Sequence, residues 1–164
     1  GGLASGVLTA VKSKNPNVKI IGVQSKSFPS MKNSLDSGNI ETVDGGFTVA
    51  DGISVKTPGK QTFEIIKEMI DEIVLVDDDE ILNAYHSMAT LEGIFCEPAS
   101  ATSVAGAMRD IKLGKIPEGS SVVCTLTGHG LKDPDTAIAQ CDQSAMINVN
   151  PTLKEVKKAI LDQM

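Results

Sequence analysis

The sequence contains no tryptophan, one tyrosine and four phenylalanines, so aromatic side chains make up only 3% of its 164 residues. A core must therefore be aliphatic, and the 41% hydrophobic content supplies enough material for one domain. No apolar run approaches the roughly 20 residues that a membrane-spanning helix needs. No stretch is typical of a secretion signal either. These absences predict a cytoplasmic globular protein with a single domain over residues 1–164 and no membrane partner.

Histidine and cysteine are also scarce, and acidic residues outnumber basic ones. The two histidines and three cysteines form no CxxC pair and no pair of histidines at ligand spacing, which argues against a metal site. Cys96 and Cys124 have apolar neighbours and are predicted to be reduced core thiols. The net charge of −6 argues against a nucleic-acid partner, because clustered Lys and Arg bind phosphate backbones. A small anionic ligand is still compatible with this charge, since backbone dipoles can bind one.

Short β-branched runs alternate with helical patterns along the chain. The runs that predict strands are residues 18–23, 73–76, 121–126 and, more weakly, 146–149. The helical patterns cover residues 4–14, 61–70, 79–91, 99–113 and 151–161. The third strand is almost continuously apolar, which is typical of a strand buried on both faces. The alternation predicts an α/β fold with a doubly wound, mostly parallel sheet and helices on both faces.

Two acidic or glycine-rich stretches need a separate interpretation. Asp77 and Asp78 stand at the start of the helix predicted over 79–91, and carboxylates there cap free amides and oppose the positive end of the helix dipole. We therefore prefer a helix cap to a metal site. Residues 38–59 are rich in glycine and are predicted to be a functional loop between elements. Asp44 and Asp51 flank glycines in this loop and could hold a cation, but a solvated loop is the preferred interpretation.

The first candidate site is the opening segment, which contains Gly1, Gly2 and Leu3. Glycines let the backbone turn and point several amides at one place, and the following helix adds its positive end. That geometry holds a phosphate. The alternative is a glycine-rich turn with a purely structural role.

The second candidate site is Thr127, which follows the predicted strand 121–126 and begins a loop with two nearby glycines. In open α/β sheets, ligands bind beyond the carboxyl ends of strands, so the Thr127 hydroxyl is predicted to lie at a crevice. The alternative is an ordinary strand-to-helix loop in which Thr127 bonds locally. His129 lies in the same loop and could touch a ligand, whereas His86 is predicted to be solvated. Glu97 precedes a proline and is interpreted first as a partner of the next helix's first turn.

These segments together resemble the fold-type II pyridoxal-phosphate enzymes, the tryptophan-synthase-β-like family. Residues 1–7 resemble the second half of the glycine loop that binds the cofactor phosphate. Residues 30–59 are similar to the threonine dehydratase (threonine ammonia-lyase) branch. Residues 92–101 and 126–135 resemble threonine synthase, and the second of these segments is the most specific in the chain.

The resemblance implies pyridoxal 5'-phosphate as the cofactor, an amino-acid substrate and a homodimer. It implies that Gly1, Gly2 and Leu3 bind the cofactor phosphate and that the Thr127 hydroxyl meets the pyridine nitrogen. A hydroxyl cannot fix a proton on that nitrogen as a carboxylate would, which suits elimination and replacement on the substrate side chain. The lysine that holds the cofactor lies upstream of the glycine loop in this family. We therefore expect that lysine to lie outside the chain, which would be the C-terminal part of the catalytic domain and inactive alone, with no catalytic residue of its own.

The resemblance leaves the reaction open between two enzymes. Threonine synthase converts O-phosphohomoserine and water to threonine and phosphate, and the likeness of residues 126–135 favours it. Threonine ammonia-lyase, which gives 2-oxobutanoate and ammonia, is the alternative, because the glycine loop and residues 30–59 are dehydratase-like. A non-catalytic α/β module that binds a small phosphorylated ligand is the alternative outside enzymes.

Overall fold

The computed structural model describes residues 1–141 and 147–161. Two strands, β1 (Ile21–Ser25) and β2 (Glu72–Val76), pair in parallel and form the sheet of the described residues. The helices are α1 (Gly2–Lys14), α2 (Ser30–Ser37), α3 (Lys60–Met69), α4 (Asp78–Leu91), α5 (Pro98–Lys112), α6 (Pro134–Ala139) and α7 (Leu153–Leu161). Two short 3-10 turns, η1 (Asp51–Ile53) and η2 (Gly130–Lys132), complete the elements.

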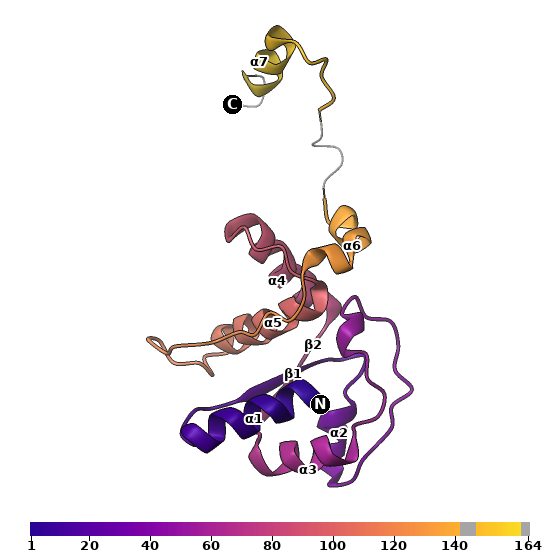
Figure 1. The fold of residues 1–164 in the computed structure, drawn as a ribbon, viewed down its shortest axis with the longest axis vertical. Coiled ribbons are helices and arrows are strands. Elements are labelled where there is room, and N and C mark those ends of the chain that lie inside the picture. The colour runs from indigo at the N-terminus through magenta and orange to yellow at the C-terminus, as the bar shows by residue number, and fades with distance from the viewer. Residues whose placement is uncertain (142–146, 162–164) are drawn as a thin grey trace. The chain divides into compact units, whose positions relative to one another are not determined.

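Helices cover both faces of this small sheet (Figure 1). In the register of the pair, Gly22 lies beside Ile73 and Val23 beside Val74, so Ile73 and Val23 point to opposite faces. Ile73 belongs to the main core cluster with Leu8 of α1 and with residues of α3. Val23 lies on the other face against α5, which in turn packs on α4. The predicted α/β class and the two-sided helical cover are confirmed, although the sheet is smaller than expected.

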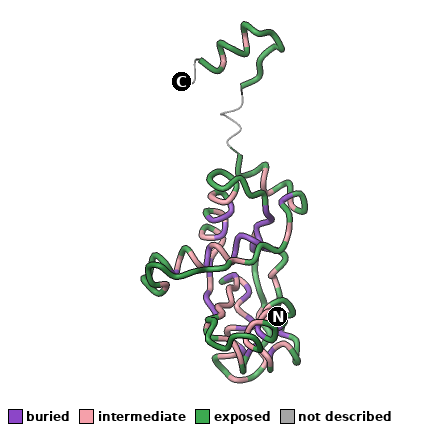
Figure 2. Tube along the Cα trace, turned by 60° about the vertical axis from the view of Figure 1, so that its left-hand side comes forward, coloured by how far each residue is buried: buried purple, intermediate pink, exposed green. Residues whose placement is uncertain are grey.

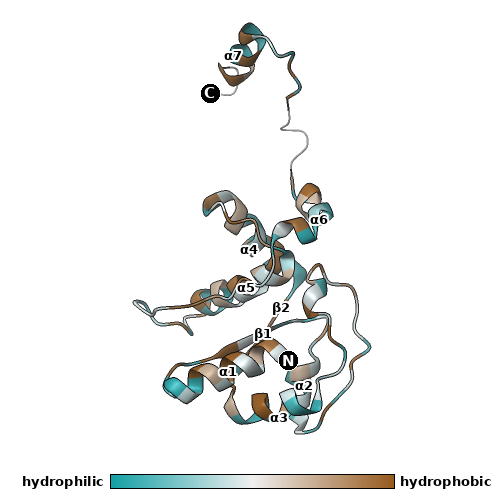
Figure 3. Cartoon of the chain, viewed as in Figure 1, coloured by the Kyte–Doolittle hydropathy of each residue, from teal (hydrophilic) through white to brown (hydrophobic). Residues whose placement is uncertain are grey.

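The chain divides into two compact units, Gly1–Pro134 and Asp135–Met164. The first unit holds the sheet, helices α1 to α5 and both 3-10 turns. The second holds most of α6 and the amphipathic helix α7, whose apolar and polar residues alternate in Figure 3. No helix among the described residues is long and apolar enough to cross a membrane.

The prediction of a strand buried on both faces at residues 121–126 is wrong. This stretch lies outside any strand and is mostly exposed in Figure 2, with Val123 at 92%. A strand exists only where a second strand supplies hydrogen-bond partners, and β1 and β2 pair with each other. Residues 121–126 instead run along α5, where the Ser103 hydroxyl donates to the Thr125 carbonyl at 3.1 Å. Of the predicted strand 146–149, residue 146 lies outside the described residues and 147–149 form no strand.

The predicted helices agree with the structure to within two residues at each end. On α3, Phe63 and Ile66 are buried as the helical pattern requires. On α4, Ile81 and Tyr85 face inward. Two helices, α2 and α6, were not predicted, because the polar sequence of α2 and the shortness of α6 give no clear apolar period.

The capping role predicted for Asp77 is confirmed. Its carboxylate accepts from the amide of Glu80 at 3.0 Å, and the Glu80 carboxylate accepts from the amide of Asp77 at 2.9 Å, which forms a capping box. Asp78 serves the neighbouring loop instead, because it accepts from the Thr48 hydroxyl at 2.6 Å and the Val49 amide at 3.1 Å. The helix start and the loop 38–59 are thus tied together.

The cap makes stability depend on pH. The hydrogen bond from Lys26, followed by that from the Glu80 amide, lowers the pKa of Asp77 below its ordinary value. The stabilisation is therefore complete above the unfolded value of about 3.9 and is lost as pH falls through the lower folded pKa. We expect Asp77→Ala to lower the free energy of unfolding by about 0.5–2 kcal/mol at neutral pH, and by less near pH 3. Urea denaturation at both pH values measures this. Asp77→Asn, which keeps an acceptor but not the charge, should lose less, and an equal loss for Asp77→Ala at both pH values would contradict the charge assignment.

Candidate functional site

The predicted phosphate-binding segment forms the beginning of α1. Gly1 is the N-cap residue, no side chain caps the helix, and Gly2 and Leu3 are exposed. The first amides of a helix have no partner within it and carry the positive end of its dipole, so this terminus can bind an anion. The hydroxyl of buried Ser5 donates to the Gly1 carbonyl and fixes the first turn.

The packing around the first position is close. A Cβ on Gly1 would lie 3.0 Å from atoms of Met31, Thr62 and Ile66. A Cβ on Gly2, by contrast, would meet nothing within 4 Å. The backbone is thus held against α2 and α3 on one side and open on the side of Gly2.

Thr127 lies in a tight hydrogen-bonded cluster with Ser100 of α5. The Ser100 Oγ accepts from the amide of Thr127 at 2.9 Å and from the amide of Gly128 at 2.7 Å. It also lies 3.0 Å from the Thr127 Oγ1 and 3.2 Å from the Gly128 carbonyl oxygen. Ser100 is only 1% exposed, whereas Thr127 is exposed. A buried helical residue therefore holds the predicted ligand-binding hydroxyl at the surface.

Ser100 is the residue that the sequence interpretation missed. It lies in the first turn of α5, where its amide donates to the Glu97 carbonyl at 3.0 Å. It lies in the segment 92–101 that resembles threonine synthase, but the sequence gave it no role of its own. The contact joins positions 27 residues apart, and only the folded chain brings them together.

Glu97 does not act as the helix cap that was expected. It occupies the N-cap position of α5, but its carboxylate makes no capping hydrogen bond. Instead it pairs with the Lys132 ammonium at 2.7 Å, and this bond raises the pKa of Lys132. The Glu97 side chain is 6% exposed, and its carboxylate lies against the loop, since a Cβ on Gly128 would be 2.2 Å from its Oε1. Glycine at position 128 thus allows the backbone to approach a buried carboxylate.

The rest of the loop is anchored to the strand-like stretch before α5. Cys96 and His129 form an antiparallel bridge, and the Gly130 amide donates to the Phe95 carbonyl at 3.1 Å. The His129 ring packs edge-on against Phe95 with 5.5 Å between centroids, and its Nδ1 accepts from the Leu131 amide at 3.1 Å. The contacts that His129 makes hold its loop to Phe95 and Cys96, and the suggested ligand contact stays a prediction. His86 is exposed, as expected.

The loop predicted over residues 38–59 is also anchored near this region. The buried hydroxyl of Ser25, at the carboxyl end of β1, donates to Thr48 at 3.2 Å. Farther along, η1 packs on α5, and a Cβ on Gly52 would lie 3.2 Å from Ala99 and 3.8 Å from the Lys132 Nζ. The described residues contain no group of three potential metal ligands, including around Asp44 and Asp51.

The two free thiols assigned to the core differ in burial. Cys96 is buried, as predicted, and burial raises the pKa of its thiol. Cys124 is only half-buried because the predicted strand around it is not formed, although desolvation raises its pKa as well. Neither thiol is therefore activated as a nucleophile.

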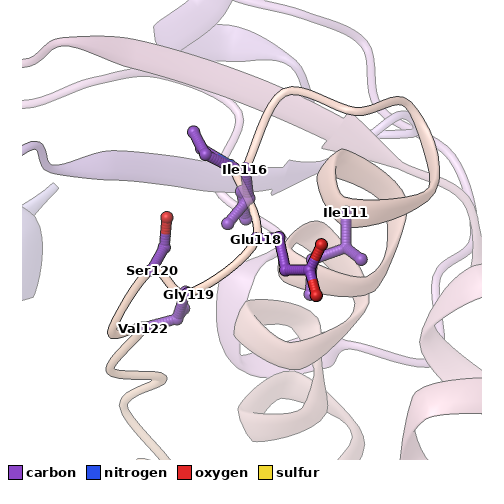
Figure 4. A pocket seen from close by; sticks show the side chains of 7 residues that line it. Ile111, Ile116, Glu118, Gly119, Ser120 and Val122 are labelled. Atoms are coloured by element: carbon purple, nitrogen blue, oxygen red, sulfur yellow. The ribbon is translucent and has the colours of Figure 1, made fainter.

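A separate hollow of about 390 Å³ lies where α5 ends and the chain turns back (Figure 4). It is lined by Ile111, Ile116, Pro117, Glu118, Gly119, Ser120 and Val122. Ile111 is 11 residues beyond Ser100 along α5, which corresponds to about 16 Å of helix. The hollow is therefore distinct from the loop that carries Thr127.

Comparison with known proteins identifies the family. Residues 1–128 match the family described as "Pyridoxal-phosphate dependent enzyme". The chain belongs to this family. The match includes both the amino end of α1 and Thr127, the two places where the sequence resemblance placed the cofactor.

The relatives include enzymes of both reactions considered above. The chain is 42% identical over 131 residues to the L-threonine ammonia-lyase of Thermotoga maritima, covering 80% of this chain and 32% of the relative. It is 42% identical over 106 residues to the threonine synthase of Mycobacterium tuberculosis, covering 63% of this chain and 29% of the relative. The chain therefore spans about a third of the length of these relatives.

A solved structure supports the fold assignment. The processed form of threonine deaminase isoform 2 from Solanum lycopersicum superposes with a TM-score of 0.79 at 32% identity, covering 85% of this chain and 40% of that one. The chain thus shares its fold with part of a longer fold-type II enzyme.

The residues present are compatible with the cofactor that the family implies. The amino end of α1 offers unsatisfied amides and open space beside Gly2, which suits a phosphate. Thr127 offers an exposed hydroxyl on a fixed backbone, which suits a ring nitrogen. Neither group requires a rearrangement of the core to be reached.

Proposed function

We propose that the protein is a pyridoxal-phosphate enzyme that works as a threonine synthase, converting O-phosphohomoserine and water to threonine and phosphate. The proposal that the protein binds pyridoxal phosphate rests on the Thr127 hydroxyl. It is exposed and held by buried Ser100, in a chain that belongs to this family. The synthase part is supported by the resemblance of residues 126–135 and by threonine synthases among the relatives.

Each part of the site has a defined task in this proposal. When bound, pyridoxal phosphate supplies the electron sink for bond breaking at the amino acid. The amides of Gly2 and Leu3 at the start of α1 bind the cofactor phosphate. Thr127 binds the ring nitrogen through its neutral hydroxyl. The ion pair of Glu97 and Lys132 stabilises the loop that carries Thr127.

Threonine ammonia-lyase is the second candidate, and one contact favours it. A substrate with its own phosphate needs cations or amides beside that phosphate. Lys132 is one of the cationic residues nearest the site loops, and its ammonium is already paired with Glu97 at 2.7 Å. The cations for a substrate phosphate would then come largely from the two thirds of the relatives' length that this chain does not match.

The product of the whole protein decides between the two reactions. We expect O-phosphohomoserine to give threonine and phosphate in equal amounts, with pyridoxal phosphate required. Threonine offered alone should give little 2-oxobutanoate. Release of 2-oxobutanoate from threonine, with no phosphate from O-phosphohomoserine, would replace the synthase with the ammonia-lyase. Absence of both activities in the cofactor-loaded protein would favour a non-catalytic binding module.

A further inference from the structure

The Ser100 hydroxyl has four possible hydrogen-bond partners, and it cannot accept hydrogen bonds from all of them. A serine hydroxyl has two acceptor lone pairs and one proton. The amides of Thr127 and Gly128, at 2.9 and 2.7 Å, can only donate, so they occupy both lone pairs of the Ser100 Oγ. Ser100 is then unable to accept a third hydrogen bond and must donate to Thr127 Oγ1 or to the Gly128 carbonyl, at 3.0 and 3.2 Å.

The consequence falls on Thr127. Because Ser100 cannot accept from it, the proton of the Thr127 hydroxyl is not used within the cluster. The backbone of Thr127 is fixed through its own amide, and the residue is exposed. Its hydroxyl therefore presents a donor toward solvent, where a ligand would lie.

We propose that Ser100 is a positioning residue that fixes Thr127 as a hydrogen-bond donor on the side where a ligand would lie. This inference rests on the proposed cofactor site. A ring nitrogen that accepts from Thr127 is stabilised in its unprotonated form, because a protonated nitrogen has no lone pair to offer. Ser100 is 1% exposed, so in this proposal it acts through Thr127 and not on a ligand itself.

The chain offers a matched control one turn along the same helix. Ser103 also uses its hydroxyl to hold this stretch, because its Oγ lies 3.1 Å from both the Ser100 and the Thr125 carbonyl oxygens and its single proton is donated to these acceptors. The acceptors of its hydroxyl are the carbonyls of Ser100 and Thr125, and neither belongs to Thr127. Ser103→Ala thus removes an α5 hydroxyl without changing the acceptor count at Ser100.

The first measurement needs no cofactor. Amide hydrogen exchange by NMR should show Thr127 and Gly128 protected in the parent and about tenfold less protected in Ser100→Ala, since one neutral hydrogen bond is lost at each amide. Ser103→Ala should leave both amides protected. Unchanged protection in Ser100→Ala would overturn the proposal, because Ser100 would then not hold the loop.

The second measurement reads the ring nitrogen. The whole protein is loaded with pyridoxal phosphate carrying ¹⁵N in the ring, and the nitrogen shift is followed against pH. We expect Ser100→Ala and Thr127→Val to raise the pKa of that nitrogen by about one unit relative to the parent, and Ser103→Ala to leave it unchanged. Thr127→Ser, which keeps the donor, should restore the parent value.

The two arms separate the failure of each claim. A normally bound cofactor whose nitrogen titrates alike in the parent and Ser100→Ala would overturn the positioning role and leave the proposed function standing. A parent protein that does not bind pyridoxal phosphate would refute the proposed function and, with it, the expected effect on the ring nitrogen. The exchange data would in that case still decide whether Ser100 holds Thr127.

Discussion

Replacing Gly128 with alanine is expected to lower the free energy of unfolding by about 1–3 kcal/mol, as overpacking of a filled site does. The new Cβ would lie 2.2 Å from the Oε1 of Glu97 and 2.4 Å from its Cδ. That carboxylate is buried and held by Lys132 at 2.7 Å, so it can yield only by breaking the ion pair or pushing the loop outward. Either movement displaces Thr127, and we expect cofactor affinity to fall about tenfold, the effect of roughly 1.4 kcal/mol.

Two control variants test the stated cause. Gly6→Ala, in the interior of α1, places a Cβ where nothing lies within 4 Å and should be neutral or slightly stabilising. In a Glu97→Ala background the obstructing carboxylate is gone, so Gly128→Ala should cost clearly less than in the parent. Urea denaturation of the four proteins of this cycle measures the coupling. The same cost in both backgrounds would show that the carboxylate is not the obstacle.

Truncation of Leu8 to alanine is expected to cost about 2–5 kcal/mol of stability, through lost burial and the cavity left behind. Leu8 is 0% exposed and lies in the cluster that joins α1 to α3 and to Ile73 of β2. Phe63 is the aromatic residue of this cluster, so few aromatic side chains are available to fill the cavity that the truncation leaves. The predicted phosphate site lies at the amino end of the same helix, α1. If the truncation unfolds α1, that site is lost as well.

The comparison residue for this truncation is Leu113, which is 59% exposed after α5. Leu113→Ala should change the free energy of unfolding by no more than about 0.5 kcal/mol. Urea midpoints with unchanged slopes would report stability alone. A Leu8→Ala protein as stable as Leu113→Ala would mean that α1 contributes little to the core.

Local sequence signals were sufficient for most of the local interactions. The capping box joins Asp77 to a residue three positions away, and the helical faces of α3 and α4 follow from residues three or four apart. The helix α5 begins at Pro98 and is followed by Gly114 at a φ of 70°, which are ordinary start and stop signals. The helix α2 escaped prediction because its buried Ser30 and Ser34 look polar in the sequence, although their hydroxyls bond to backbone carbonyls.

Interactions between distant segments could not be predicted from local patterns. The run 121–126 has the composition of a buried strand, yet composition cannot supply the neighbouring strand on which β structure depends. Glu97 illustrates the same limit. Its place before Pro98 predicted a cap, but a lysine 35 positions away captures the carboxylate once the loop folds over α5.

The sequence by itself determined the α/β class, the positions of most helices, the family and the two segments that resemble a cofactor site, because these depend on periodicity and on short contiguous motifs. Only the tertiary structure decided that buried Ser100 holds Thr127, that Gly128 lies on the Glu97 carboxylate, and that β1 and β2 pair with each other. Such contacts depend on which distant groups share one small volume. The number of lone pairs and protons, and the free space in that volume, decide which contacts form, and a sequence pattern does not contain this information.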